Sequence, residues 1–201
     1  MGRILTLALA ALLGGCAMGV YSEQPLFEKC GPQPADGLWA LLPDGCAAPA
    51  SASMTHWPEC AVPVWIGGGT ATTMVNMSLV HLPLIVADGE PHIIQTVAVQ
   101  QPAGIPSAQA APTAIGVDAT ATASDQSAPG FQYWAFIPDG PAPWRKAKLW
   151  PIGCPDKEMP GITKVDDQSC AAANAEAVRA AGRLAPPADK LRTAVWIAAQ
   201  D

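Results

Sequence analysis

Basic residues are scarce in this chain. It carries 11 lysines and arginines against 17 aspartates and glutamates, which gives a formal net charge of −6 at pH 7. An acidic surface repels phosphate backbones, so we expect no nucleic-acid partner. Long apolar runs are missing as well, because no segment after the first fifteen residues approaches the roughly twenty residues that a membrane-spanning helix needs.

Histidines and the common catalytic motifs are also few. The histidines are His56, His81 and His92, and the chain contains no G-x-S-x-G, S-x-x-K or H-E-x-x-H sequence. A hairpin at Asp88-Gly89 would let His81 and His92 meet as metal ligands or a general base, but half-exposed strand histidines are the more common explanation. Gly67–Gly69 lacks the lysine and the strand-to-helix context of a phosphate loop. We therefore expect no cofactor and no metal, and favour a protein that is not an enzyme.

What the chain does have is a distinctive beginning. One basic residue, Arg3, precedes an apolar run from Ile4 to Leu13, which is half the length of a transmembrane helix and typical of a signal peptide. Where a small-x-small cleavage site would stand, the sequence reads Leu13-Gly14-Gly15-Cys16. This pattern resembles the lipobox of bacterial lipoproteins.

The resemblance implies that Cys16 is the lipid attachment site and that residues 1–15 are a lipoprotein signal peptide that is removed. Acyl chains on Cys16 would make the lipid bilayer a partner, since two or more chains hold a protein stably at a membrane. Ala17 stands where an aspartate would be an inner-membrane retention signal, so the resemblance favours the periplasmic face of the outer membrane. Loss of Arg3 makes the mature chain more acidic still.

The sequence after Cys16 divides into two parts. Residues 16–36 are polar and proline-containing, with little periodicity, and predict a flexible tether that lifts the domain off the membrane. Residues 37–201 predict a single β-rich globular domain, long enough to bury roughly 70 % of its unfolded surface. Within it, residues 101–113 are a low-complexity loop without apolar rhythm.

Short apolar or alternating runs, bounded by proline, glycine and aspartate, predict strands. These runs lie at residues 37–42, 61–66, 72–86 (divided by a proline), 92–100, 114–124, 131–137, 144–152 and 191–198. Asp166 or Asp167, less favourably Ser169, is expected to cap the one convincing helix, which ends near Gly182. Together these elements predict a mainly β (α+β) fold. We expect a curled antiparallel sheet, a small barrel or sandwich, with one helix in the C-terminal region and a final strand.

Five cysteines remain besides Cys16, and an oxidising envelope compartment would pair four of them. With one cysteine left over, fifteen arrangements of two bridges are possible. We favour pairing within short loops, and each such bridge would contribute about 3 kcal/mol in the chain-entropy model. This choice leaves Cys30 free and predicts the bridges Cys46–Cys60 and Cys154–Cys170.

Tryptophan is unusually frequent, with seven residues against three phenylalanines and two tyrosines. Indole rings suit both cores and binding pockets, and in a small curled sheet most of them are expected in the core. The functional alternative is that three tryptophans line a face for an apolar or sugar ligand, with two neighbouring lysines providing local positive charge. This candidate ligand face consists of Trp134, Trp144, Lys146, Lys148 and Trp150.

Three functions fit these observations. The first is a membrane-anchored envelope lipoprotein with a non-catalytic domain that binds an apolar ligand, a glycan or a protein partner in the periplasm. The second is a structural protein that interacts with other outer-membrane components. The third is a small periplasmic hydrolase or enzyme inhibitor, since small disulfide-containing β-barrel lipoproteins that inhibit lysozyme resemble this chain in size and placement.

Overall fold

The computed structural model describes residues 19–28, 31–75, 78–98, 130–186 and 188–199. Cys16, Cys30 and the strand predicted at residues 114–124 lie outside these ranges. Within them the chain forms one α-helix, α1 (Ala175–Gly182), and twelve strands. The strands are β1 (Gly19–Ser22), β2 (Gly37–Pro43), β3 (Val62–Gly67), β4 (Thr70–Val75), β5 (Ser78–Pro83), β6 (Ile85–Ala87), β7 (His92–Val97), β8 (Phe131–Pro138), β9 (Lys146–Pro151), β10 (Ile162–Lys164), β11 (Ser169–Ala172) and β12 (Arg192–Ala198).

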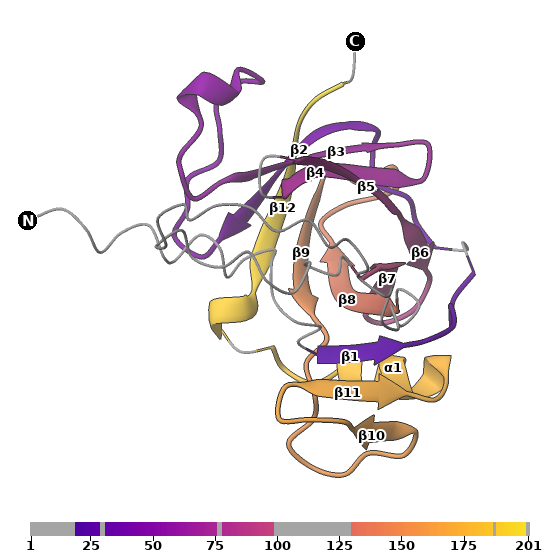
Figure 1. Ribbon diagram of the computed structural model, residues 1–201. Coiled ribbons are helices and arrows are strands. Elements are labelled where there is room, and N and C mark those ends of the chain that lie inside the picture. Colours follow the sequence, from indigo (N-terminus) through magenta and orange to yellow (C-terminus); the bar gives the residue numbers. More distant parts are fainter. Residues whose placement is uncertain (1–18, 29–30, 76–77, 99–129, 187, 200–201) are drawn as a thin grey trace, which may run out of the picture.

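The strands form one curled, mixed sheet in the order β10-β11-β1-β8-β9-β12-β2-β3-β4-β5 (Figure 1). In addition, β7 pairs with β8, and β6 pairs with β7. The mainly β class, the single helix and the final strand are confirmed. The expectation of a wholly antiparallel sheet is wrong at one pair, because β1 lies parallel to β11. Leu84 separates β5 from β6, which pair with β4 and β7 respectively, so the described strands curl without closing into a barrel.

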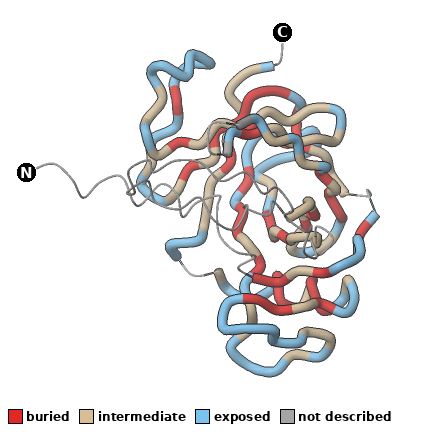
Figure 2. The backbone as a smooth tube through the Cα atoms, viewed as in Figure 1, coloured by how far each residue is buried: buried red, intermediate tan, exposed pale blue. Residues whose placement is uncertain are grey.

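Of the three apolar clusters among the described residues, the two larger ones both receive side chains from β8, because successive side chains of a strand point to opposite faces. Tyr133 and Ala135 join Ile93 and Val178 in the cluster beneath α1. Phe136 belongs to the second cluster, inside the curl. Figure 2 shows the buried segments following the curled sheet, with exposed residues in the turns around it. Each large side chain buried in this way contributes roughly 1.5–3 kcal/mol.

The N-terminal segment is part of this sheet, which corrects the prediction of a flexible tether at residues 16–36. β1 pairs with β11 through Gly19–Tyr21 and with β8 through Tyr21 and Ser22. Val20 is 2 % exposed and Phe27 is 7 % exposed, both within the cluster beneath α1. The sequence did not predict β1, because four residues are too few to establish a periodicity. The prolines that follow it favoured the interpretation of an irregular segment.

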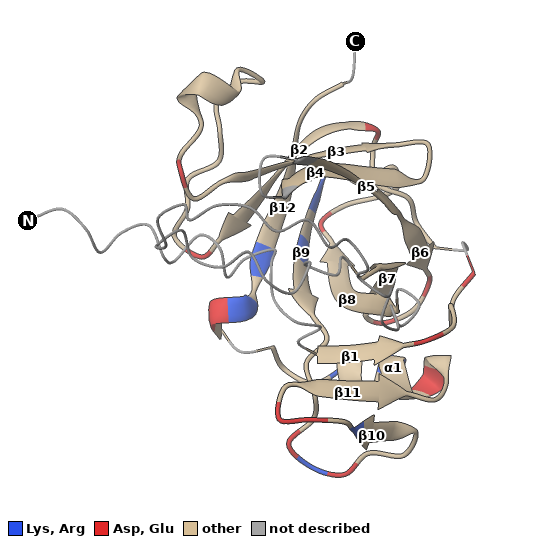
Figure 3. Cartoon of the chain, viewed as in Figure 1, with Lys and Arg blue, Asp and Glu red and all other residues tan. Residues whose placement is uncertain are grey.

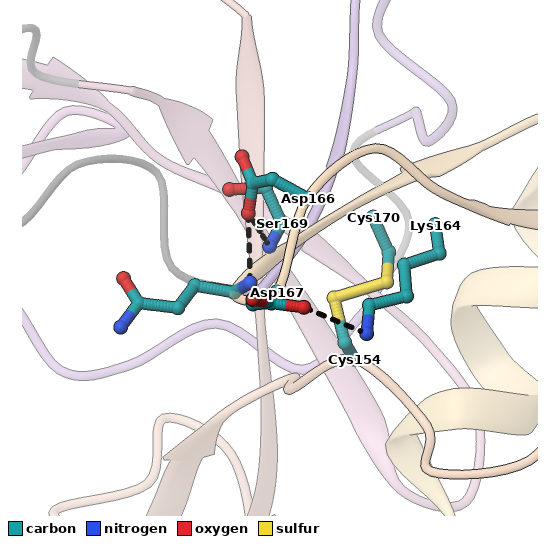
Figure 4. A network of polar contacts seen from close by, with 7 residues as sticks. Cys154, Lys164, Asp166, Asp167, Ser169 and Cys170 are labelled. Atoms are coloured by element: carbon teal, nitrogen blue, oxygen red, sulfur yellow. Dashed lines mark hydrogen bonds and ion pairs between the residues drawn. A yellow bond between two sulfur atoms is a disulfide. The ribbon is translucent and has the colours of Figure 1, made fainter.

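Helix α1 begins later than the sequence predicted. Its N-cap is Asn174, whose side-chain oxygen accepts a hydrogen bond from the Ala177 amide at 2.9 Å. Asp166 lies instead in the turn between β10 and β11, where Oδ1 accepts hydrogen bonds from the amides of Gln168 and Ser169, both at 2.7 Å (Figure 4). Aspartate uses the same hydrogen-bonding geometry in a turn as at a helix N-terminus, which explains the wrong prediction.

Both predicted disulfides are present. Cys46 and Cys60 are joined across a separation of 14 residues, and Cys154 and Cys170 across 16 residues. The second bridge links the segment after β9 to β11 (Figure 4). No helix in the described ranges has both the length and the apolar character needed to cross a bilayer.

Candidate functional site

The structure separates the residues of the predicted ligand face. Trp144 is 3 % exposed and packs against Trp39 and Phe136, with ring centroids 5.1 and 5.0 Å apart. Trp150 is buried in the other cluster, beneath α1. Trp134 is half-buried against the cluster that holds Trp144. These three indoles therefore belong mainly to the core, and they do not form a continuous surface.

The two lysines of that predicted face are exposed on β9, where Figure 3 shows positive charge. Lys146 donates a hydrogen bond to the Asp139 carboxylate at 2.8 Å. This hydrogen bond, with the charge of Lys146, lowers the pKa of Asp139. Lys148 is exposed between the buried side chains of Ala147 and Leu149, whereas Trp150 is buried beneath the end of α1.

Two of the histidines have different partners. His81 Nδ1 lies 2.8 Å from Thr72 Oγ1, across the β4–β5 pair. His92 Nδ1 lies 3.1 Å from an Asp88 carboxylate oxygen, and its ring packs against Phe136. In the part of the chain that the structure describes, no three His, Cys, Asp or Glu side chains come together in a group that could hold a metal ion.

A cleft of about 500 Å³ lies where several segments distant in the sequence meet. Its walls are the segment before β2, the end of β3 with the turn to β4, the residue between β5 and β6, the segment just before β9, and the C-terminal part of β12. Ile66 and Leu84 contribute apolar surface to it. The charged and aromatic side chains that line it are Asp36, Arg145 and Trp196.

Strand pairing sets the position of Trp196. β12 lies between β2 and β9, and its pairing with β2 shifts register between Trp196 and Ala198. The Trp196 indole donates a hydrogen bond to the Asp36 carbonyl at 3.0 Å. Gly37 has a φ of +136°, and a Cβ there would lie 2.1 Å from the Ala198 carbonyl oxygen, so only glycine permits this close approach.

Trp196 in turn positions Arg145. The Arg145 guanidinium carbon lies 4.3 Å from the centroid of the indole ring, a cation–π arrangement. Within the described ranges, no hydrogen bond or ion pair engages the guanidinium or the Asp36 carboxylate, and both side chains are exposed. The cleft therefore contains two charged groups of opposite sign that do not neutralise each other.

A second, more apolar cleft of about 610 Å³ lies beside the end of α1. Its walls include Trp150, Cys154, Ala181 and Leu184. The Trp150 indole nitrogen is buried without a hydrogen-bond partner among the described residues. The Cys154–Cys170 disulfide fixes one wall of this cleft to β11.

Sequence reasoning missed the first cleft because its residues share no local pattern. Asp36, Arg145 and Trp196 come from three separate regions, and only the pairing of β12 with both β2 and β9 brings these regions together. Trp196 is one of seven tryptophans, and Arg145 is a single basic residue next to the predicted ligand face. Nothing in the sequence near Asp36 marks it as part of a site.

Comparison of the chain with protein-family models, with curated proteins and with solved structures finds no match. The function is therefore argued from the residues and the geometry of the clefts.

Proposed function

We propose that this chain is an envelope lipoprotein, held at the periplasmic face of the outer membrane by acyl chains on Cys16, whose β-rich domain binds a small ligand without catalysis. The Leu13-Gly14-Gly15-Cys16 sequence supports the lipid anchor. The two disulfides support an oxidising compartment, where such bonds form and persist.

The observation that carries the binding function is the cleft that contains Arg145 and Trp196. Its volume of about 500 Å³ is within the range of small-molecule sites, and it combines apolar walls with a few polar groups. A guanidinium stacked on an indole is already oriented, so binding through its N–H groups costs less conformational entropy. The described residues that line the cleft include no Ser, Thr, Cys, His, Lys or Tyr, which favours binding over nucleophilic catalysis.

The proposal is tested by extracting the full chain from bacterial membranes in mild detergent and recording its native mass spectrum. We expect a mature chain that begins at Cys16 with added acyl mass, together with a bound small molecule. The variant Ala199→Trp places an indole at the exposed rim of the cleft and is expected to lose that small molecule. Ala188→Trp, at an exposed position outside the cleft, is the matched control and should retain it.

Two results would contradict the proposal. A chain that starts at Met1, or a Cys16 without added lipid mass, would remove the anchor. A bound molecule that persists equally in both variants, or its absence from the unaltered chain, would remove the cleft as the binding site.

A further inference from the structure

The first cleft contains opposite charges that have not paired. Arg145 and Asp36 both line it, yet no ion pair joins them and no other described side chain neutralises either group. Elsewhere, three exposed lysines lie within 4 Å of an aspartate: Lys146 with Asp139, Lys164 with Asp167, and Lys190 with Asp189. Arg145 and Asp36 differ from these pairs in that they line the same cleft without an ion pair between them.

The Trp196 side chain contacts both charged residues. The stacking on Trp196 holds the Arg145 guanidinium over the indole. The hydrogen bond from the same indole to the Asp36 carbonyl fixes the backbone that carries the carboxylate. One tryptophan therefore holds the Arg145 guanidinium directly and the Asp36 backbone through a hydrogen bond.

From this arrangement we infer that the cleft takes a small zwitterion, with its carboxylate on Arg145 and its ammonium group on Asp36. This inference rests on the proposed function, that the cleft is a ligand site. A guanidinium matches a carboxylate through paired N–H donors, whereas an exposed carboxylate attracts an ammonium group and repels an anion. Ile66 and Leu84 supply apolar surface for the part of the molecule that joins the two charged groups.

A purely anionic ligand fits less well, because Asp36 would repel it, and a purely cationic ligand would be repelled by Arg145. A neutral sugar would leave both charges without a counter-charge. Only a molecule that carries both signs gains from both walls.

The test uses the detergent-extracted full chain and a series of straight-chain ω-amino acids, from 4-aminobutanoate to 8-aminooctanoate, measured by isothermal titration calorimetry. Affinity should pass through a maximum at the chain length that matches the spacing of the two charges. The n-alkylamine and the n-alkanoate of that length should bind roughly ten- to a hundredfold more weakly, because each lacks one charge-assisted contact.

Variants then assign each end of the probe. In the Arg145→Gln variant, the amino acid should no longer bind more tightly than the alkylamine. In the Asp36→Asn variant, it should no longer bind more tightly than the alkanoate. The matched controls are Lys148→Gln, on β9 just after Arg145 but outside the cleft, and Asp44→Asn, at an exposed turn. Both controls should leave the affinities unchanged.

The outcomes separate this inference from the proposed function. If alkanoates bind as tightly as the amino acids, or if no probe binds while Ala199→Trp still removes the co-purified molecule, the zwitterion inference is wrong and the binding function stands. Amino-acid binding that survives Ala199→Trp would place the probe outside the cleft and overturn the inference. Failure of the probes together with failure of the Ala199→Trp test would contradict both.

Discussion

At the scale of single residues, Gln95 shows how one buried polar side chain holds a chain segment to the sheet. It lies on β7 and is fully buried. Its Oε1 atom accepts hydrogen bonds from the Leu26 amide at 2.8 Å and the Phe27 amide at 3.0 Å, and its Nε2 atom donates to the Phe27 carbonyl at 3.4 Å. A glutamine can satisfy donors and an acceptor at once, and here it substitutes for strand pairing.

Replacing Gln95 by leucine should therefore destabilise the protein strongly. The volume is similar, but two backbone N–H groups and one carbonyl would lose their partner in a buried site, at a cost of about 1–3 kcal/mol for each buried group left without one. We expect a loss of about 3 kcal/mol or more in the free energy of unfolding, measured by urea denaturation. Gln132→Leu, at a half-buried position on β8 whose side chain has no hydrogen bond to another described residue, is the control and should change the free energy of unfolding by less than about 1 kcal/mol. Equal effects would show that Gln95 acts only by filling space.

At the scale of elements, the turn between β10 and β11 depends on one carboxylate. The hydrogen bond from the Gln168 amide, followed by that from Ser169, lowers the pKa of Asp166. Within the part of the chain that the structure describes, the side chain of its neighbour Asp167 makes only an exposed ion pair with Lys164, and such pairs contribute little. The two adjacent aspartates therefore differ in role although the sequence does not distinguish them.

Asp166→Ala should lower the melting temperature near neutral pH more than Asp167→Ala does. Because the pKa of Asp166 is lowered by folding, the contribution of Asp166 to stability is complete above the ordinary aspartate pKa of about 4. It is lost as the pH falls through that value toward the lower folded-state pKa. The difference between the two variants should shrink over that range in thermal melts recorded by circular dichroism. A difference that is constant with pH would contradict a role for the ionised carboxylate.

Elements with a strong pattern were predictable from the sequence, and those fixed by long-range pairing were not. The apolar runs that became β2, β3, β8 and β12 are marked by period and by turn residues, and the two short-range disulfides follow from spacing. The cap of α1 was misplaced because Asp166 and Asn174 have equivalent local chemistry, so tertiary packing decides between them. The cleft lined by Arg145 and Trp196 could not be predicted, because its position depends on the order of the strands in the sheet, and local sequence patterns do not contain that order.

At the scale of the whole molecule, the N-terminal segment joins the proposed anchor to the domain almost directly. Two residues separate Cys16 from Gly19 at the start of β1, and an extended chain covers at most about 3.6 Å per residue. Acyl chains on Cys16 would therefore hold the end of the domain that carries β1, β11 and α1 close to the bilayer. Figure 1 shows the C-terminal end of β12 on the opposite side of the molecule from β1. That end of β12 carries Trp196, so this anchor would turn the proposed ligand cleft away from the membrane.

The same observation predicts where the folding unit begins. A soluble chain of residues 19–201 should fold, whereas residues 37–201 should not form a stable domain, because they lack the buried side chains of Val20 and Phe27 and leave edges of β8 and β11 unpaired. Those two side chains alone contribute roughly 3–6 kcal/mol, which is comparable with the about 5–15 kcal/mol that stabilises a whole domain. Urea unfolding followed by circular dichroism would compare the two chains. If their unfolding midpoints coincided, β1 would be an attachment to a complete domain, and the original expectation of a tether ending at residue 36 would be correct.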